Sequence, residues 1–303
     1  MINSIMFKSR VRFYENLQPT ALICKIFGYF PLQNSFQSDG LKLKYKVLSL
    51  HTVYGPMLNI TFCLLTMLYY SKVLLRLNIV TIYALRGIIS VIITSYYDRY
   101  LPELIHQIEK FEISLKRFKK MNKEITDSNK SMRYLGLIGC TSYIMYSFVR
   151  LFSVKSLTVY EVYVYFATIF SRSRTFYIIL YVLFCYITKQ HFRHLTIIWK
   201  DTKKNILKEN WNNIMRIKLL DEYDMEEVRL LHAELLKIVR NLNNCYGPRM
   251  AYALLLTVLE ALLDFYVVFF TKASTSSLMI YSIFNTTTIF VITISGERLS
   301  NEV

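Results

Sequence analysis

Apolar blocks alternate with charged blocks along the whole chain, and six of the apolar blocks are long enough to cross a bilayer as helices. They cover residues 47–70, 77–97, 134–152, 162–188, 250–270 and 277–295. A bilayer core about 30 Å thick needs roughly 20 apolar residues in a helix. Because backbone groups in lipid must find their hydrogen-bond partners within the segment, helices are favoured. The pattern therefore predicts an all-α membrane protein with about six transmembrane helices.

The fourth block is the least regular, because Arg172 and Arg174 interrupt it. Its membrane-spanning part could instead begin near Thr175, with residues 162–170 forming a helical extension on the outer side. Both alternatives keep six spans.

Lys and Arg are concentrated in alternate connecting segments. Three segments together hold twenty-seven cations and the other three hold six; the former are 1–46, 98–133 and 189–247, and the latter are 71–76, 153–174 and 271–276. Cytoplasmic loops carry the excess of Lys and Arg. We therefore expect a multi-pass plasma-membrane protein with its N-terminus and both long loops in the cytoplasm.

This topology divides the chain into three parts. Residues 1–46 form a cytoplasmic N-terminal segment, and residues 296–303 form a short cytoplasmic tail. The transmembrane helical bundle covers 47–295 and includes the long cytoplasmic helical loops 98–133 and 189–247.

The composition excludes some alternatives. Of the 303 residues 53% are hydrophobic, yet 37 Lys+Arg stand against 21 Asp+Glu. Because the cations lie between apolar blocks, membrane topology explains them, and the expected partner is a lipid bilayer rather than nucleic acid. The five cysteines are scattered without metal-ligand spacing, so we expect no disulfide framework, metal or cofactor.

Both long inner segments carry apolar residues at three- and four-residue spacing, which is typical of amphipathic helices. The first stripe is Leu101, Leu104, Ile108, Phe111, Leu115 and Phe118, and the second is Val228, Leu231, Leu235, Ile238 and Leu242. In one interpretation the spans extend past the membrane and pack together there. In the other, the second stripe serves assembly between subunits.

Three of the ionisable residues inside the predicted spans are candidates for a function. Arg86 lies midway in the second span, where an arginine costs about 2.5–3.5 kcal/mol, so it should face the bundle interior or a wet cavity. Glu260 and Asp264 lie one turn apart in the fifth span and therefore on one face. They could pair with Arg86, line a polar ligand pocket or couple ions.

Two histidines, His191 and His194, follow the fourth block at a spacing that could suit a metal. Since they stand beside Lys189 and Arg193 without a third ligand, we interpret them as interfacial polar residues. The sequence has no nucleophile elbow, phosphate loop or HExxH motif, so we expect no enzyme.

Aromatic residues gather in the outer halves of the third, fourth and sixth spans. An interfacial aromatic belt and a pocket for a small organic ligand both have this composition. The residues assigned to the ligand are Tyr146, Phe148, Tyr163, Phe166, Tyr281 and Asn285, together with Arg86, Glu260 and Asp264.

Two segments resemble motifs of the insect gustatory receptors. Residues 26–32, with Phe27-Gly28 and Pro31, resemble the FG-x-x-P segment of that family. Residues 231–247, with Leu231-His232, Leu235 and Tyr246-Gly247, are similar to its LH-x-x-L … LN-x-x-(F/Y)G passage.

The resemblance implies a chemosensory ligand-gated cation channel that is related to the insect odorant receptors. Such receptors have seven spans and form tetramers, homomeric or heteromeric, whose cytoplasmic helices join the subunits. Their ligands are small organic tastants, and their seventh span lines the pore. This sequence stops at Val303, where that span would follow, so we expect a form that lacks the pore helix.

Two further functions remain open at this stage. A six-span transporter could use Glu260 and Asp264 as coupling carboxylates. A non-conducting assembly subunit could use the second stripe to bind longer relatives.

Overall fold

The structure is a computed structural model of the whole chain. It describes residues 13–37, 40–47, parts of 49–64, residues 89 and 93, and then 96–116, 121–152, 175–209, 217–271 and 275–302. Within these ranges the side chains of 263–286 and 205–224 are not described, nor are a few others next to the segments that the structure leaves out.

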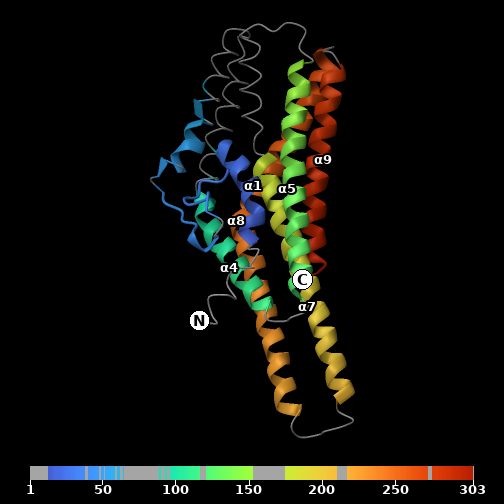
Figure 1. Cartoon of the computed structure of the whole chain (residues 1–303). Coiled ribbons are helices and arrows are strands. Elements are labelled where there is room, and N and C mark those ends of the chain that lie inside the picture. The colour runs from blue at the N-terminus through green and yellow to red at the C-terminus, as the bar shows by residue number, and fades with distance from the viewer. Residues whose placement is uncertain are drawn as a thin grey trace.

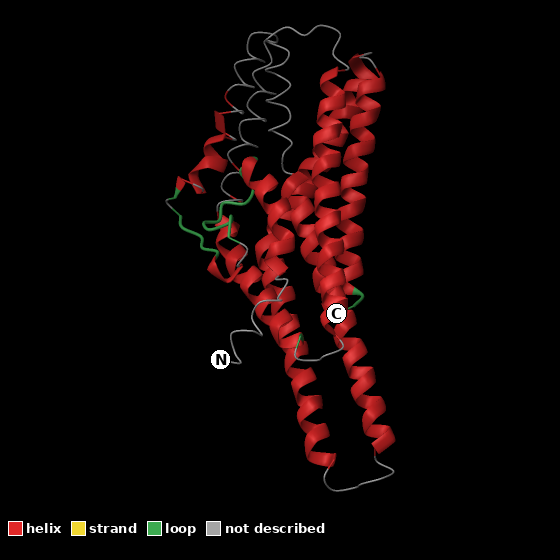
Figure 2. Ribbon diagram, viewed as in Figure 1, coloured by secondary structure: helices red, strands yellow, loops and turns green. Residues whose placement is uncertain are grey.

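Long helices build almost all of the described chain (Figures 1 and 2). They are α1 (Phe13–Ile26), α4 (Leu101–Leu115), α5 (Met121–Phe152), α7 (Thr175–Glu209), α8 (Ile217–Thr271) and α9 (Thr275–Ser300), with the short 3₁₀ turns η2 (Gly40–Lys42) and η3 (Asp98–Tyr100). The prediction of an all-α fold is confirmed for these residues. Their one β feature is an isolated bridge between Gln33 and Lys44.

The long helices α5, α7, α8 and α9 run along one axis, and α7 contacts the other three (Figure 1). The helices α1 and α4 lie against this bundle, with α1 on α5 and α4 on α8. At one end α7 and α8 extend beyond the other helices as two separate arms (Figure 1).

Helix α4 shows how the sequence produces this packing. Pro102 lies in its first turn, where its missing N–H has no intrahelical partner to lose, and Glu103 adds a favourable negative charge there. The apolar stripe from Leu101 to Leu115 is buried, as predicted. Phe118, the last residue of that stripe, lies outside the described residues.

The second stripe lies on α8, and its five residues are buried within this chain. Helix α8 runs without interruption from Ile217 through Pro248 to Thr271, so the stripe and the fifth apolar block form one helix. Packing within one subunit is therefore sufficient to explain why these five positions are apolar. Its role in assembly between subunits stays a prediction.

The remaining apolar blocks are covered unevenly. The fourth block is described from Thr175 onward, in α7, and residues 162–174 lie outside the described chain, so both starts of its membrane-spanning part stay predictions. The third and sixth blocks lie in α5 and α9, whereas most of the first two are not described. In the part of the chain that the structure describes, no helix is both long and apolar enough to count as a candidate membrane span.

The first motif segment forms a tight turn after α1. Gly28 has a φ of 83°, in the left-handed region that glycine occupies readily. A Cβ atom at Gly28 would lie 2.5 Å from the Cα atom of Gly55. Two glycines are therefore needed where these two backbones meet.

Candidate functional site

The structure describes the side chains of two of the predicted ligand-binding residues, Tyr146 and Phe148, and both lie on α5. Tyr146 is half-buried and Phe148 is 49% exposed. Because residues two positions apart on a helix do not share a face, these two side chains point in different directions. They can line one pocket only together with residues from other helices.

For four further predicted ligand-binding residues the structure describes the backbone but not the side chain. Glu260 and Asp264 lie one turn apart on α8, and Tyr281 and Asn285 lie one turn apart on α9. Each pair therefore shares a face of its helix. Arg86, Tyr163 and Phe166 lie outside the described residues, so the meeting of Arg86 with the two carboxylates stays a prediction.

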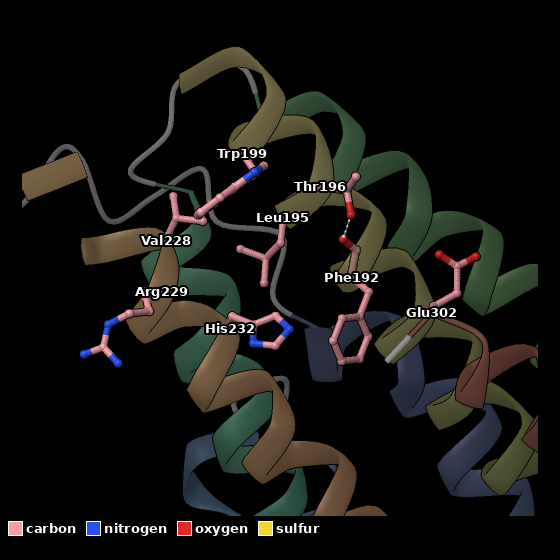
Figure 3. Close-up of a pocket in the computed structure, with 8 residues that line it drawn as sticks. All are labelled: Phe192, Leu195, Thr196, Trp199, Val228, Arg229, His232 and Glu302. Atoms are coloured by element: carbon pink, nitrogen blue, oxygen red, sulfur yellow. Dashed lines mark hydrogen bonds between the residues drawn. The ribbon is translucent and has the colours of Figure 1, made fainter. Parts of the chain in front are cut away.

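A described pocket opens between α7 and α8, at the end of the bundle where these helices separate (Figure 3). Its volume is about 400 Å³, and its lining residues are Phe192, Leu195, Thr196, Trp199, Val228, Arg229, His232 and Glu302. Pockets for small molecules start at about 300 Å³. The size is therefore sufficient for a small organic molecule.

The pocket has an apolar floor and a charged rim. Phe192 meets His232 edge-to-face with ring centroids 5.9 Å apart. Arg229 points away from the cavity in Figure 3 and donates to Glu226 at 2.6 and 2.7 Å. At the opposite side Glu302 lies 3.2 Å from Nζ of Lys189. Since both charged rim residues have partners, the pocket offers mainly an apolar and aromatic surface.

A second candidate site is a buried polar cluster between α4, α5 and α7. Nδ2 of Asn129 donates to both carboxyl oxygens of Glu112 at 3.0 Å. Nε2 of His191 lies 3.6 Å from Oε1 of Glu112, and His194 stands one turn further along α7. Neither ring nitrogen of His191 has a hydrogen-bond partner.

Burial controls the protonation of this cluster. It raises the pKa of Glu112 to about 8, although Lys116 and the hydrogen bonds from Asn129 oppose the shift. It lowers the pKa of His191 to about 3, and the neighbouring His194 and Lys116 lower it further. At neutral pH the pair therefore holds a neutral acid beside a neutral imidazole.

The histidines correct the sequence analysis, which placed them at an interface. His191 and His194 are buried, with exposed fractions of 0% and 4%. The ring of His191 packs on Phe111 of α4 with ring centroids 5.1 Å apart, and the rings of His191 and His194 have centroids 6.1 Å apart. Among the described residues no group of three His, Cys, Asp or Glu side chains is placed to hold a metal ion.

A buried ion pair joins η3 to α8. Nη2 of Arg249 lies 2.5 Å from Oδ1 of Asp98. Burial disfavours the charge of Arg249, but Asp98, Cys245 and Tyr246 together outweigh it and keep the pKa of the guanidinium above its usual value. Burial raises the pKa of Asp98, and Arg249 opposes that shift.

The sequence analysis did not identify Glu112, Asn129, Asp98 or Arg249. A signal for Glu112 was present, because it falls at helical spacing from Ile108 and Leu115 within the first stripe. A carboxylate on an apolar face needs a partner. No comparable signal marked Asn129, which lies 17 residues away on another helix.

The second motif segment lies in the core. Leu231, Leu235 and Tyr246 are buried, and the ring of Tyr246 packs against that of Phe184 with centroids 5.7 Å apart. Cys245, next to it, contacts the backbone oxygen of Tyr97 through Sγ at 3.7 Å. The motif therefore joins α8 to α7 and to the segment before η3.

Comparison with known families explains why both motifs occur together. The model of the family described as 7tm Chemosensory receptor matches residues 17–303, which include both motif segments. The comparison with curated proteins gives no match. The family match confirms the resemblance drawn from the motifs. The chain belongs to the 7tm chemosensory receptor family, and it is a membrane protein with the role of a chemoreceptor.

Proposed function

We propose that this chain is a gustatory receptor subunit of a ligand-gated cation channel that detects small organic tastants. The observation that carries the proposal is the family match over residues 17–303. The two motif segments support the gustatory branch, since both resemble gustatory receptor motifs. In this proposal about six helices span the plasma membrane with a cytoplasmic N-terminus, as the distribution of Lys and Arg indicates.

The ligand site in this proposal is formed by aromatic residues of α5 and α9 and by the carboxylates of α8. Tyr146 and Phe148 are its testable members, because their side chains are described. An aromatic ring offers a large apolar surface, and its loss weakens binding by roughly 1.5 kcal/mol. That loss corresponds to about tenfold in affinity.

Expression in cells that lack chemoreceptors tests the proposal. The chain is expressed alone and together with another member of the family. Cation current is recorded while a panel of small organic tastants is applied one compound at a time. We expect a tastant-evoked current when the chain is co-expressed with the other family member, and Tyr146→Ala should shift the response about tenfold toward higher tastant concentration. Tyr134→Ala, which removes a 64% exposed ring from the same helix, is the matched control.

Absence of current from a chain that reaches the cell surface, in both settings, would contradict the channel proposal. Glu260 and Asp264 share one face of α8, and this observation favours a transporter as the second candidate. Substrate uptake that Glu260→Gln abolishes, without any current, would decide for the transporter.

A further inference from the structure

Two ordinarily charged side chains lie buried next to each other between α4 and α7. The side chain of Glu112 is 2% exposed and that of His191 is 0% exposed, with Oε1 and Nε2 separated by 3.6 Å. This distance is just longer than a hydrogen bond, so a small shift of either side chain closes it. Both nitrogens of His191 lack a hydrogen-bond partner.

The groups around this pair leave its charge uncompensated. On α4, Glu109 and Lys116 act on Glu112 with opposite signs. His194 on α7 and Lys116 both disfavour the charged form of His191. On α5, Asn129 is neutral, and Glu124 is exposed and acts on His194 rather than His191. Backbone amides of Tyr14 and Gly40 donate to Glu109 at 3.2 Å and supply no cation.

The number of protons on the pair therefore decides its net charge. With one proton, carried by Glu112, the pair is a neutral acid beside a neutral imidazole. Without a proton it is a buried anion, and with two protons it is a buried cation; both are unfavourable in a dry interior. We propose that Glu112 and His191 form a single-proton site that holds α4 against α7, and that losing or gaining a proton loosens this contact.

The direction of each pKa shift fixes the pH range. Glu112 has its pKa raised from 4.5 to about 8, so it contributes stability below pH 4.5 and loses that contribution as the pH rises toward 8. His191 has its pKa lowered from 6.5 to about 3, so its contribution is complete above pH 6.5 and is lost as the pH falls toward 3. Between 4.5 and 6.5 the two slopes cancel.

The folded chain should consequently be most stable at about pH 4.5–6.5 with respect to this site, and less stable toward pH 8. The full-length chain in detergent micelles tests this through its thermal unfolding midpoint at a series of pH values. Glu112→Gln, a neutral mimic of the protonated acid, should reduce or remove the fall above about pH 6.5. The control is Glu103→Gln, at an exposed position of α4 where Glu103 accepts a hydrogen bond from Gln107. This variant should still lose stability above about pH 6.5.

An unchanged fall in the Glu112→Gln variant would overturn the proposal. If that variant does not fold, infrared spectra of the unmodified chain test whether Glu112 is protonated. A protonated carboxyl band should be present near neutral pH, disappear as the pH rises past about 8, and move in Glu112→Asp. Absence of this band near neutral pH would also overturn the proposal. These measurements need neither ligand nor current, so their outcome is separate from that of the receptor test.

Discussion

Arg249 donates from Nη2 to Oδ1 of Asp98 at 2.5 Å, across 151 residues of the chain. Asp98 directly follows the second apolar block, and Arg249 directly precedes the fifth. Their side chains are only 2% and 3% exposed. This buried ion pair therefore connects the ends of two apolar segments that are far apart in the sequence.

Breaking this pair should be costly. Asp98→Asn leaves the Arg249 guanidinium buried without its counter-charge, which we expect to cost about 3–5 kcal/mol of folding stability. The double variant Asp98→Leu with Arg249→Met should cost less than the sum of the two single changes, because no lone charge remains. Thermal unfolding of the purified chain measures both.

The exposed pair of Glu226 and Arg229 provides the control for that experiment. Their carboxylate and guanidinium form two hydrogen bonds on the surface of α8. Glu226→Gln should leave the unfolding midpoint nearly unchanged, since exposed ion pairs add little. If Asp98→Asn and Glu226→Gln lowered the unfolding midpoint equally, the stabilising role given to Asp98 would be contradicted.

The turn at Gly28 should not accept a side chain. Gly28→Ala places an L-residue at φ 83°, which costs roughly 1–2 kcal/mol, and sets its Cβ against the backbone of Gly55. We expect low yields or a lowered unfolding midpoint in fluorescence-detected size exclusion. Gly296→Ala is the control, because a Cβ there makes an ordinary contact of 3.4 Å with Oη of Tyr181. Equal behaviour of the two variants would show that the turn tolerates a side chain.

Two glycines on α5 should respond differently to alanine. A Cβ at Gly136 would meet Thr20 of α1 and lie 2.9 Å from Cδ1 of Leu183 on α7, where three helices pack closely. We expect a destabilisation of about 1–3 kcal/mol for Gly136→Ala. A Cβ at Gly139 comes no closer than 3.4 Å to Ile179, so Gly139→Ala should be neutral or stabilise the helix by up to about 1 kcal/mol. Thermal unfolding separates the two, and a larger loss for Gly139→Ala would refute this packing.

Neighbouring leucines on α8 test whether the second stripe packs within one subunit. Leu235 is 0% exposed and Leu236 is 38% exposed. Leu235→Ala should cost about 2–5 kcal/mol of folding stability because it opens a cavity. Leu236→Ala should stay within about 0.5 kcal/mol. Native mass spectrometry adds the oligomeric state: if Leu235→Ala separates subunits that remain fully stable, the stripe serves assembly instead.

The helical fold, much of the core and the family could all be predicted from the amino-acid sequence. Apolar periodicity predicted the buried faces of α4 and α8 because a 3.6-residue repeat places its apolar residues on one side. The motifs around Gly28 and Tyr246 indicated the chemosensory receptors, and the family match agrees.

The polar residues that meet in the interior could not be paired without the three-dimensional structure. Glu112, Asn129 and His191 come from α4, α5 and α7, and Asp98 and Arg249 join η3 to α8. Periodicity assigns a residue to a face of its own helix, but it holds no information on which helix lies opposite. His191 and His194 therefore resembled residues at the membrane interface in the sequence, whereas in the folded chain both are buried and His191 contacts Phe111 of α4. Burial in turn shifts their protonation, and it exists only once the helices have packed.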